Sequence, residues 1–518
     1  MKHICTVVFL IVLILSVAHA QANDIVVTQF GALGNGIHDD APAIRAALNS
    51  AKKADCVVFP AGSYLLQSGS GFIYGDNEYI LVLPGNIEIR GERGAQLKIG
   101  DGLAYKTSAR RGMALIFAEN CNDISISNMR FELNGANNLV PDDSRQITGY
   151  ALRLYNCNNT RISNCEIMNG YGQNAIVISG YASNGCEITN NIIINGGTSI
   201  IGNRYQDDYS AIYSCAQNTL ITGNRIASDC FPFANSGAVE IHNSDSIVEN
   251  NIFEKCQPGI YICSDFSGKT TERIAVRNNK FLRCNRGIFF DGTGDFADID
   301  ISGNYFGMKR FQQSSKFSLA AAIQTRRTDS PVYDYTQIIK KLNVSDNEMN
   351  EEFIDMPLKA SACFARIASV YGGIFKNNRI SHISGQAFEL LGSPFGMKNI
   401  FIVDNQVCNF GLNRSPYSHA AIDLYFSGSS KQPPKKSFSA SNLYFFNNSF
   451  VMEKEYSIES CGFSAGYDQK SGLTNIIYGG NSFTGVKQTT QPARIILNEG
   501  SLPDNWQAQT QDRQNDQL

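Results

Sequence analysis

The chain has 518 residues, of which 43% are hydrophobic, and its formal net charge is −3 at pH 7. A chain of this length can bury a substantial core, so we expect a large folded protein. The slightly acidic balance argues against nucleic-acid binding, which favours a basic face, and beyond the N-terminal segment nothing predicts a membrane span.

The N-terminal segment has the features of a secretory signal peptide. Lys2 supplies the charged start, residues 7–17 form a short apolar core, and the Ala-His-Ala run at residues 18–20 suits signal cleavage. The apolar core is too short for a comfortable membrane span. We therefore predict a signal peptide over residues 1–20 and a mature protein that is secreted or periplasmic.

The mature chain is expected to begin with a short helix. Asp39 or Asp40 can cap this helix, and Pro42 suits its first turn. An apolar stripe follows at helical spacing, formed by Ile44, Ala47, Leu48 and Ala51. Strand-like segments follow at residues 56–60 and 61–66. We expect the helix to lie across one end of a larger array of strands.

This N-terminal part resembles a known superfamily. The resemblance is carried by two runs, FGALGNGIHDDAPAIRAAL at residues 30–48 and VVFPAGSYLL at residues 57–66. Both are similar to the N-terminal signature of the pectate lyase-like superfamily of right-handed parallel β-helix proteins. That group includes polygalacturonases, rhamnogalacturonases, polysaccharide lyases, mannuronan epimerases and phage tailspikes. The resemblance implies the fold and leaves the reaction open.

A short phrase repeats from about residue 126 to residue 483. It consists of an apolar residue, two variable residues, Asn, one further residue, and then Phe or Ile. Two early copies carry Met129 and Cys165 in the Asn position. The later copies carry Asn191, Asn224, Asn251, Asn279, Asn304, Asn347, Asn378, Asn405, Asn448 and Asn481. The spacings are typical of solenoid repeats, whose coils must stack to bury their apolar faces. We expect the Asn side chains to form an internal ladder.

The repeats predict an all-β protein: a right-handed single-stranded parallel β-helix of about 12 coils with a short N-terminal α-helix cap. We expect one domain over residues 21–502, with the cap at 24–66, and a disordered polar tail over 503–518.

Removing Cys5 leaves an odd number of cysteines. Stacked buried thiols are a better interpretation than disulfides, although export would permit disulfides. Monomer and homotrimer both stay open.

Alternate residues of the strand that opens each coil point inward and outward. The inward positions are Ile176, Ile178, Val239, Ile241, Ile260, Ile262, Ile288 and Phe290. On the outward face Glu240 and His242 lie near the middle, with Tyr213 and Tyr261 one coil away. Asp291 is two coils away, and Arg153 lies further toward the N-terminus. Such a set supplies an acid, a base and sugar-stacking surfaces, although polar residues also simply solvate an exposed sheet.

Loops beside this face add further acids. Asp207 and Asp208 precede one opening strand, and Asp229 lies in the next long loop. The run QDDYSAI at residues 206–212 resembles the polygalacturonase phrase Gly-Asp-Asp-Cys-x-Ala-Ile. Gln replaces the first Gly, and the Gly-His-Gly and Arg-x-Lys phrases of that family are missing. Adjacent Asp residues also occur in ordinary turns.

These residues favour an exported, pectinase-like glycoside hydrolase that cleaves glycosidic bonds in a polysaccharide. The reaction needs two carboxyl groups around the scissile bond, which we assign to Glu240 and Asp208, with His242 as a third catalytic residue. We assign substrate binding to Asp207, Asp229, Tyr213, Tyr261, Asp291 and Arg153. No cofactor is expected for this reaction.

Two alternatives stay open. A polysaccharide lyase would act on a uronic-acid-containing glycan by β-elimination. Ca²⁺ held by the loop aspartates would neutralise the substrate, and His242, Tyr261 or Arg286 would remove the proton. A non-catalytic glycan-binding or tailspike-like surface protein is the other alternative, because the fold hosts both kinds of protein. An epimerase is disfavoured, because the Asp-Pro-His phrase expected after Tyr171-Gly172 is missing.

Overall fold

The structure is a computed structural model. It describes residues 23–106, 112–138, 150–170, 174–196, 209–228, 236–309, 320–325, 337–352, 362–391, 395–412, 420–426, 439–453, 461–467, 472–486, 488–490 and 498–499. The predicted signal peptide, the polar tail and the acids Asp207, Asp208 and Asp229 lie outside these residues.

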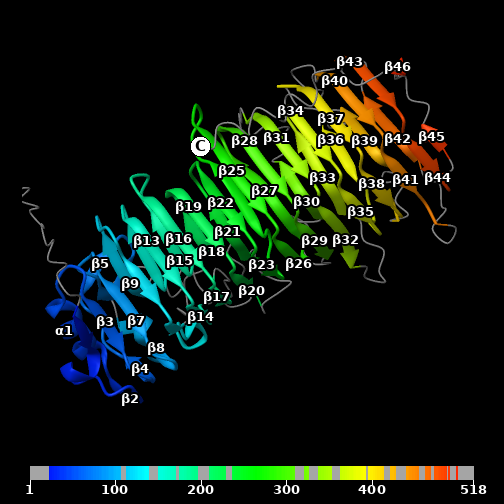
Figure 1. Cartoon of the computed structure of the whole chain (residues 1–518). Coiled ribbons are helices and arrows are strands. Elements are labelled where there is room, and N and C mark those ends of the chain that lie inside the picture. The colour runs from blue at the N-terminus through cyan, green and yellow to red at the C-terminus, as the bar shows by residue number, and fades with distance from the viewer. Residues whose placement is uncertain are drawn as a thin grey trace, which may run out of the picture.

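The described strands form three long sheets that run side by side along the chain (Figure 1). Sheet A has 16 strands, from β1 (Asp24–Val26) to β46 (Asn498–Glu499). Sheet B has 15 strands, from β2 (Asn35–Asp39) to β44 (Ser482–Thr484). Sheet C also has 15 strands. One coil contributes one strand to each sheet, and the next coil adds its strands alongside in parallel. This is the predicted right-handed parallel β-helix.

Sheet C carries the residues of functional interest. All its neighbouring strands pair in parallel except the first two, which form an antiparallel hairpin. Its strands are β5 (Phe72–Tyr74), β6 (Asn77–Val82), β9 (Met113–Glu119), β12 (Leu152–Tyr155), β15 (Ile176–Ser179), β18 (Tyr209–Ser214), β21 (Ser236–Ile241), β24 (Ile260–Ser264), β27 (Arg286–Gly292), β30 (Ala320–Thr325), β33 (Ala362–Ala368), β36 (Phe388–Leu391), β39 (Ala420–Phe426), β42 (Cys461–Tyr467) and β45 (Gln488–Thr490).

One continuous core fills the inside of the solenoid. The inward positions predicted from strand alternation are all fully buried in it. Aromatic rings also stack from coil to coil: the ring centroids of Phe253 and Phe281 are 5.1 Å apart, and those of Phe281 and Phe306 are 4.7 Å apart. Each such side chain contributes about 1.5–3 kcal/mol by leaving water. Stacking of the coils is thus what buries the apolar face of each coil.

The predicted Asn ladder is present inside the turn between sheets A and B. Asn279 Nδ2 donates to the backbone oxygen of Val248 at 2.8 Å and to Asn304 Oδ1 at 3.0 Å. Its own Oδ1 accepts from the backbone nitrogen and Nδ2 of Asn251, both at 3.0 Å. The preceding Asn278 has a φ of 53°, a left-handed conformation that Asn and Gly tolerate best. This explains why Asn or Gly commonly precedes the ladder residue.

The sheets contain more strands than the 12 coils counted from the Asn phrase. The difference arises because the first coils, such as β3 (Cys56–Phe59) and β7 (Glu88–Gly91) in sheet A, do not carry that phrase. The count of 12 therefore covers only the coils that carry the phrase, two of which have Met129 and Cys165 in the Asn position.

The N-terminal cap is helix α1 (Ala41–Ser50), at the blue end of Figure 1. Ile44, Ala47 and Leu48 are buried, as the apolar stripe predicts. Asp39 Oδ1 accepts a hydrogen bond from the backbone nitrogen of Ala41 at 3.2 Å. The carboxylate of the N-cap residue, Asp40, instead accepts bonds from the backbone nitrogens of residues 33 and 34. The pair of aspartates thus fixes both the helix start and the preceding turn.

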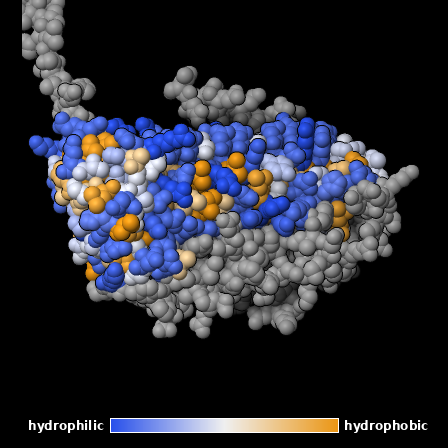
Figure 2. Space-filling model, turned by 90° about the horizontal axis from the view of Figure 1, so that it is seen from below, coloured by the Kyte–Doolittle hydropathy of each residue, from blue (hydrophilic) through white to orange (hydrophobic). Residues whose placement is uncertain are grey.

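The surface seen in Figure 2 is mainly hydrophilic, with hydrophobic residues gathered near the end that holds α1 and in a patch about half-way along. No helix in the described part of the chain is long and apolar enough to cross a membrane. The cysteines described from Cys56 to Cys408 are free, and all but Cys408 are buried. Buried thiols, rather than disulfides, are therefore found at these positions.

Replacing Asn279 by Ala tests the ladder. The change removes four hydrogen bonds and leaves buried backbone groups without partners, so we expect the free energy of unfolding to fall by about 2–4 kcal/mol. Asn184 is exposed, and Asn184→Ala should change the free energy of unfolding by less than about 0.5 kcal/mol. Urea denaturation followed by circular dichroism measures both. Equal effects of the two substitutions would contradict a structural role for the ladder.

Candidate active site

Parallel pairing in sheet C brings the predicted central residues together. The register places Tyr213 of β18 beside Glu240 of β21, and Glu240 beside Tyr261 of β24. Since neighbouring strands lie about 4.8 Å apart, these three side chains form one outward row. His242 directly follows β21 and points to the same face. The structure thus brings Glu240, His242 and Tyr213 together.

Glu240 is the centre of a buried hydrogen-bond network. Only 8% of its surface is exposed. Its Oε2 accepts a hydrogen bond from Ser210 Oγ at 3.0 Å, and its Oε1 lies 3.0 Å from His242 Nε2. The other ring nitrogen, Nδ1, lies 2.7 Å from Asp265 Oδ1. An imidazole is therefore held between two carboxyl groups.

The turn after β24 supplies the second of these carboxyl groups. Asp265 also accepts a hydrogen bond from the hydroxyl of Tyr181. Lys269, at the end of the same turn, donates from Nζ to the backbone oxygen of His242 at 2.8 Å, and its Nζ lies 4.3 Å from the centre of the Tyr181 ring. These contacts fix the turn against the sheet, so that Asp265 is positioned by three neighbouring side chains.

Aromatic rings border the network. The ring centroids of Tyr213 and His242 are 4.4 Å apart. Tyr181 is 48% exposed and Phe266 is 58% exposed, and their ring centroids are 5.9 Å apart. Exposed aromatic faces beside carboxyl groups are well suited to stacking on sugar rings.

The electrostatics favour a positively charged His242. Burial alone disfavours the imidazolium, but Cys263 and the hydrogen bonds to Asp265 and Glu240 outweigh it and hold the pKa of His242 well above its usual value. Burial raises the pKa of the Cys263 thiol to about 12, so Cys263 supports the imidazolium by its charge only at high pH, and near pH 7 the hydrogen bonds to Asp265 and Glu240 do so. Burial would raise the pKa of Asp265, but its bond to His242 holds that pKa below the usual range.

This charge state defines what His242 can do. Both ring nitrogens carry protons in the imidazolium, and both are bonded to carboxyl groups. The ring is therefore arranged to hold Glu240 in place through its Nε2. Proton removal from a substrate, the role that a lyase would require of His242, would first need one of these bonds to break.

Asp291 and Arg153 lie further from this network, whereas Tyr261 is next to Glu240 in the register. Asp291 pairs alongside Cys263, one strand beyond β24. The ring of Tyr261 packs edge-on against Phe289, with centroids 5.8 Å apart. Arg153 is three strands toward the N-terminus, where its guanidinium carbon lies 5.2 Å from the ring centre of Tyr74 and 5.1 Å from that of Tyr150. Arg153 thus packs against two tyrosine rings that are not part of the network around Glu240.

Sequence reasoning missed Ser210, Tyr181, Asp265 and Lys269. For two of them a signal was present: Asp265 continues the outward alternation of Tyr261 and Cys263, and Tyr181 continues that of residues 177 and 179. Both residues lie just beyond the end of a strand, where alternation no longer guarantees the direction of a side chain.

The outward row continues along sheet C toward the C-terminus. From Tyr261 the register leads to Phe289, Gln324, Arg366, Glu389 and Asp423. Arg366 Nε and Glu389 Oε2 are 3.3 Å apart. Gln324, Arg366 and Asp423 are each less than 10% exposed. The face beyond Glu240 is therefore polar and charged over several coils.

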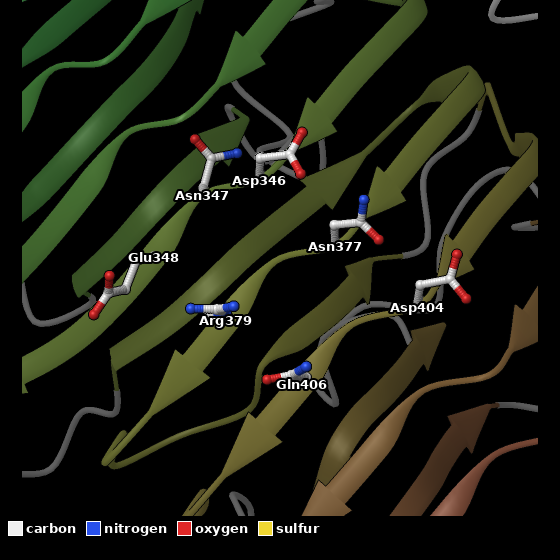
Figure 3. Close-up of a pocket in the computed structure, with 7 residues that line it drawn as sticks. All are labelled: Asp346, Asn347, Glu348, Asn377, Arg379, Asp404 and Gln406. Carbon is white, nitrogen blue, oxygen red and sulfur yellow. The ribbon is translucent and has the colours of Figure 1, made fainter.

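A separate furrow of about 430 Å³ lies between sheets A and B (Figure 3). It is lined by Asp346, Asn347, Glu348, Asn377, Arg379, Asp404 and Gln406. These side chains recur at equivalent positions of successive coils, and Figure 3 shows them spread over neighbouring turns and strands. The furrow therefore follows from the repeat itself, and we place the candidate active site on sheet C.

The charge of His242 gives a testable pH dependence. An unfolded histidine titrates near about 6.5, and the folded pKa lies above that value. The ion pairs therefore stabilise the fold fully below pH of about 6.5, and this contribution is lost as the pH rises through the folded pKa. NMR of histidine-labelled protein should show one imidazolium persisting at pH 7, and His242→Gln should remove that signal. A neutral His242 at pH 7 would contradict this charge assignment.

Comparisons with known proteins agree with this fold. Residues 25–289 match the family described as rhamnogalacturonase A/epimerase, pectate lyase-like, and this span is more than half of the 518 residues. No curated protein matches the chain.

Solved tailspike structures have a similar fold. A variant of the tailspike protein of E. coli bacteriophage HK620, in complex with a pentasaccharide, has a TM-score of 0.57 at 14% identity, covering 89% of this chain and 80% of that chain. A second variant of that tailspike has a TM-score of 0.58 at 14% identity, covering 88% and 78%. An exopolygalacturonase of family 28 from Yersinia enterocolitica has a TM-score of 0.49 at 12% identity, covering 91% and 79%. At such identities the tailspike structures support the fold alone. From the family match, the chain belongs to the rhamnogalacturonase A/epimerase family of pectate lyase-like proteins.

Proposed function

We propose that the chain is a secreted glycoside hydrolase that cleaves a polysaccharide lying across sheet C, with Glu240 as a catalytic carboxylate. The observation that carries the proposal is the environment of Glu240. One of its oxygens is hydrogen-bonded by Ser210 and the other by the His242 ring, on a sheet face bordered by exposed aromatic side chains.

The charge on His242 suggests which role Glu240 takes. A carboxylate bonded to an imidazolium is stabilised in its ionised form. Glycoside hydrolysis needs one ionised carboxylate, which activates water or attacks the anomeric carbon, and one carboxylic acid, which protonates the leaving oxygen. We therefore assign the ionised role to Glu240, with His242 and Ser210 as positioning residues.

The proton donor requires a second carboxyl group that stays protonated. Asp265 does not suit this role, because its pKa is held below the usual range. We propose Asp208 as the donor, with Asp207 and Asp229 contacting substrate, since these residues flank β18 and β21 in the sequence.

The substrate is proposed to be a polysaccharide. Tyr213 offers an aromatic surface next to Glu240, and Tyr181 and Phe266 offer further ones near Asp265. The polar row beyond Tyr261 offers hydrogen-bonding partners for further sugar units. That a tailspike of this fold is solved with a pentasaccharide supports a sugar chain as the ligand class. The predicted signal peptide fits an extracellular polymer as substrate.

Incubation of the mature protein with a panel of polysaccharides tests the reaction class. A hydrolase produces new reducing ends without ultraviolet absorbance, whereas a lyase produces both, because β-elimination leaves an unsaturated sugar. We expect reducing ends alone. Unsaturated products would overturn the hydrolase assignment, and retention on a glycan column without any cleavage would favour a binding protein.

Glu240→Gln tests the central residue. Because the amide cannot act as base or nucleophile, we expect kcat to fall by at least about 10³-fold, with thermal unfolding within a few degrees of the unaltered protein. Glu119 lies on the same sheet and is exposed, so Glu119→Gln should retain activity. A normally folded, active Glu240→Gln protein would exclude Glu240 from catalysis.

Asp208→Asn tests the proposed donor. Loss of the acid should lower kcat most for substrates with poor leaving groups and much less for aryl glycosides, whose leaving groups need little protonation. Asp207→Asn is the matched control and should change KM more than kcat. Equal losses on both kinds of substrate would contradict a donor role for Asp208.

A further inference from the structure

Three potential metal ligands converge at the same place in sheet C. A carboxylate oxygen of Glu240, a ring nitrogen of His242 and the sulfur of Cys263 all lie within 4.8 Å of one another. The three residues are only 8%, 6% and 5% exposed. In the described part of the chain no other group of His, Cys, Asp and Glu side chains meets this condition.

The fold explains the convergence. Glu240 pairs beside Tyr261, so Cys263, two residues further along β24, lies beside His242, two residues beyond Glu240. The three ligand atoms therefore come from two adjacent parallel strands and the residue that follows one of them. Such a site is rigid, because both strands are held by coils on either side.

The spacing of the atoms suits a tetrahedral cation. In a zinc site with bonds of about 2.0–2.3 Å, neighbouring ligand atoms are roughly 3.3–3.5 Å apart. Here Glu240 Oε1 is 3.0 Å from His242 Nε2 and 3.9 Å from Cys263 Sγ. Shifts of a few tenths of an ångström in side chains would bring these two separations into that range.

The groups around the three ligands support the same interpretation. Metal-binding histidines usually donate their second nitrogen to a carboxylate, and Asp265 occupies that position at 2.7 Å from Nδ1. Metal-binding carboxylates are usually held by a hydrogen bond on the other oxygen, and Ser210 supplies this bond to Oε2 of Glu240 at 3.0 Å. Both hydrogen bonds go to atoms other than Glu240 Oε1 and His242 Nε2, which are the two atoms that would bind the cation.

We propose that Glu240, His242 and Cys263 form a binding site for a thiophilic divalent cation such as Zn²⁺. One thiolate, one imidazole and one carboxylate form a donor set that zinc-like cations accept, whereas Ca²⁺ and Mg²⁺ require oxygen ligands. On binding, the Cys263 thiol and the Nε2 nitrogen each release a proton to solvent.

The cation and the hydrogen bond between Glu240 and His242 exclude each other. A metal-bound Nε2 cannot donate to Glu240, and a metal-bound Glu240 cannot attack substrate or activate water. The cation therefore acts as a reversible inhibitor of the enzyme. This consequence rests on the proposed function, whereas the binding site itself does not.

Titration with Co²⁺ tests the site. The full-length mature protein is first dialysed against a chelator, and thiolate-to-cobalt absorbance is then followed as Co²⁺ is added. We expect one Co²⁺ per chain with a charge-transfer band. Cys263→Ser should abolish the band and weaken Zn²⁺ binding by about 100-fold or more, and Asp265→Asn by about 10–100-fold.

Cys215→Ser provides the matched control. This thiol lies two coils before Cys263 and donates to the hydroxyl of Tyr213 at 3.4 Å, outside the three ligand atoms. The Cys215→Ser substitution should leave the charge-transfer band and the ratio of one Co²⁺ per chain unchanged. No stoichiometric Co²⁺ binding, or a band that persists in a folded Cys263→Ser protein, would overturn the proposal.

Activity with and without one equivalent of Zn²⁺ separates the two proposals. Zn²⁺ should lower the cleavage rate of the unaltered and Cys215→Ser proteins at least about 10-fold. For Cys263→Ser, the ratio of the rates with and without Zn²⁺ should stay near one. Cys263-dependent metal binding in a protein that cleaves no polysaccharide would leave the metal site standing and reject the hydrolase. Cleavage of a polysaccharide without Cys263-dependent metal binding would support the hydrolase and reject the metal site.

Discussion

Stacking of successive coils is the constraint on which the whole structure depends. A single coil of three short strands has no core of its own, and only the next coil covers its apolar side chains and pairs its backbone groups. The Asn ladder makes this stacking specific, because each amide bonds both the previous and the next one inside the turn. A shift of one residue would break the ladder and turn the inward side chains outward.

The same constraint positions the candidate active site. With the register fixed, Tyr213, Glu240 and Tyr261 must lie side by side, and His242 must lie beside Cys263. The network of Glu240, His242 and Asp265 is therefore set on a rigid frame, as preorganised catalytic groups require. The charge of the imidazolium is tolerated here because each of its two nitrogens is bonded to a carboxyl group.

The sequence was most informative where the repeat is regular. Strand alternation correctly predicted the inward columns and the outward positions of Glu240 and His242, since period and register follow from simple sterics. It could not predict Asp265, whose direction depends on the turn that Lys269 and Tyr181 hold against the sheet. Nor could it predict that His242 binds a carboxyl group through each nitrogen, because this depends on distances between coils. The coil number was underestimated because the first coils lack the Asn phrase.

The most direct measurement is a crystal structure of the Glu240→Gln variant with an oligosaccharide of the polysaccharide that the unaltered protein cleaves. The account predicts a sugar chain across sheet C, with a glycosidic linkage within about 4 Å of the residue 240 side chain and a sugar ring against Tyr213 or Tyr181. A sugar chain bound elsewhere, such as the furrow lined by Asp346, Arg379 and Asp404, would contradict it.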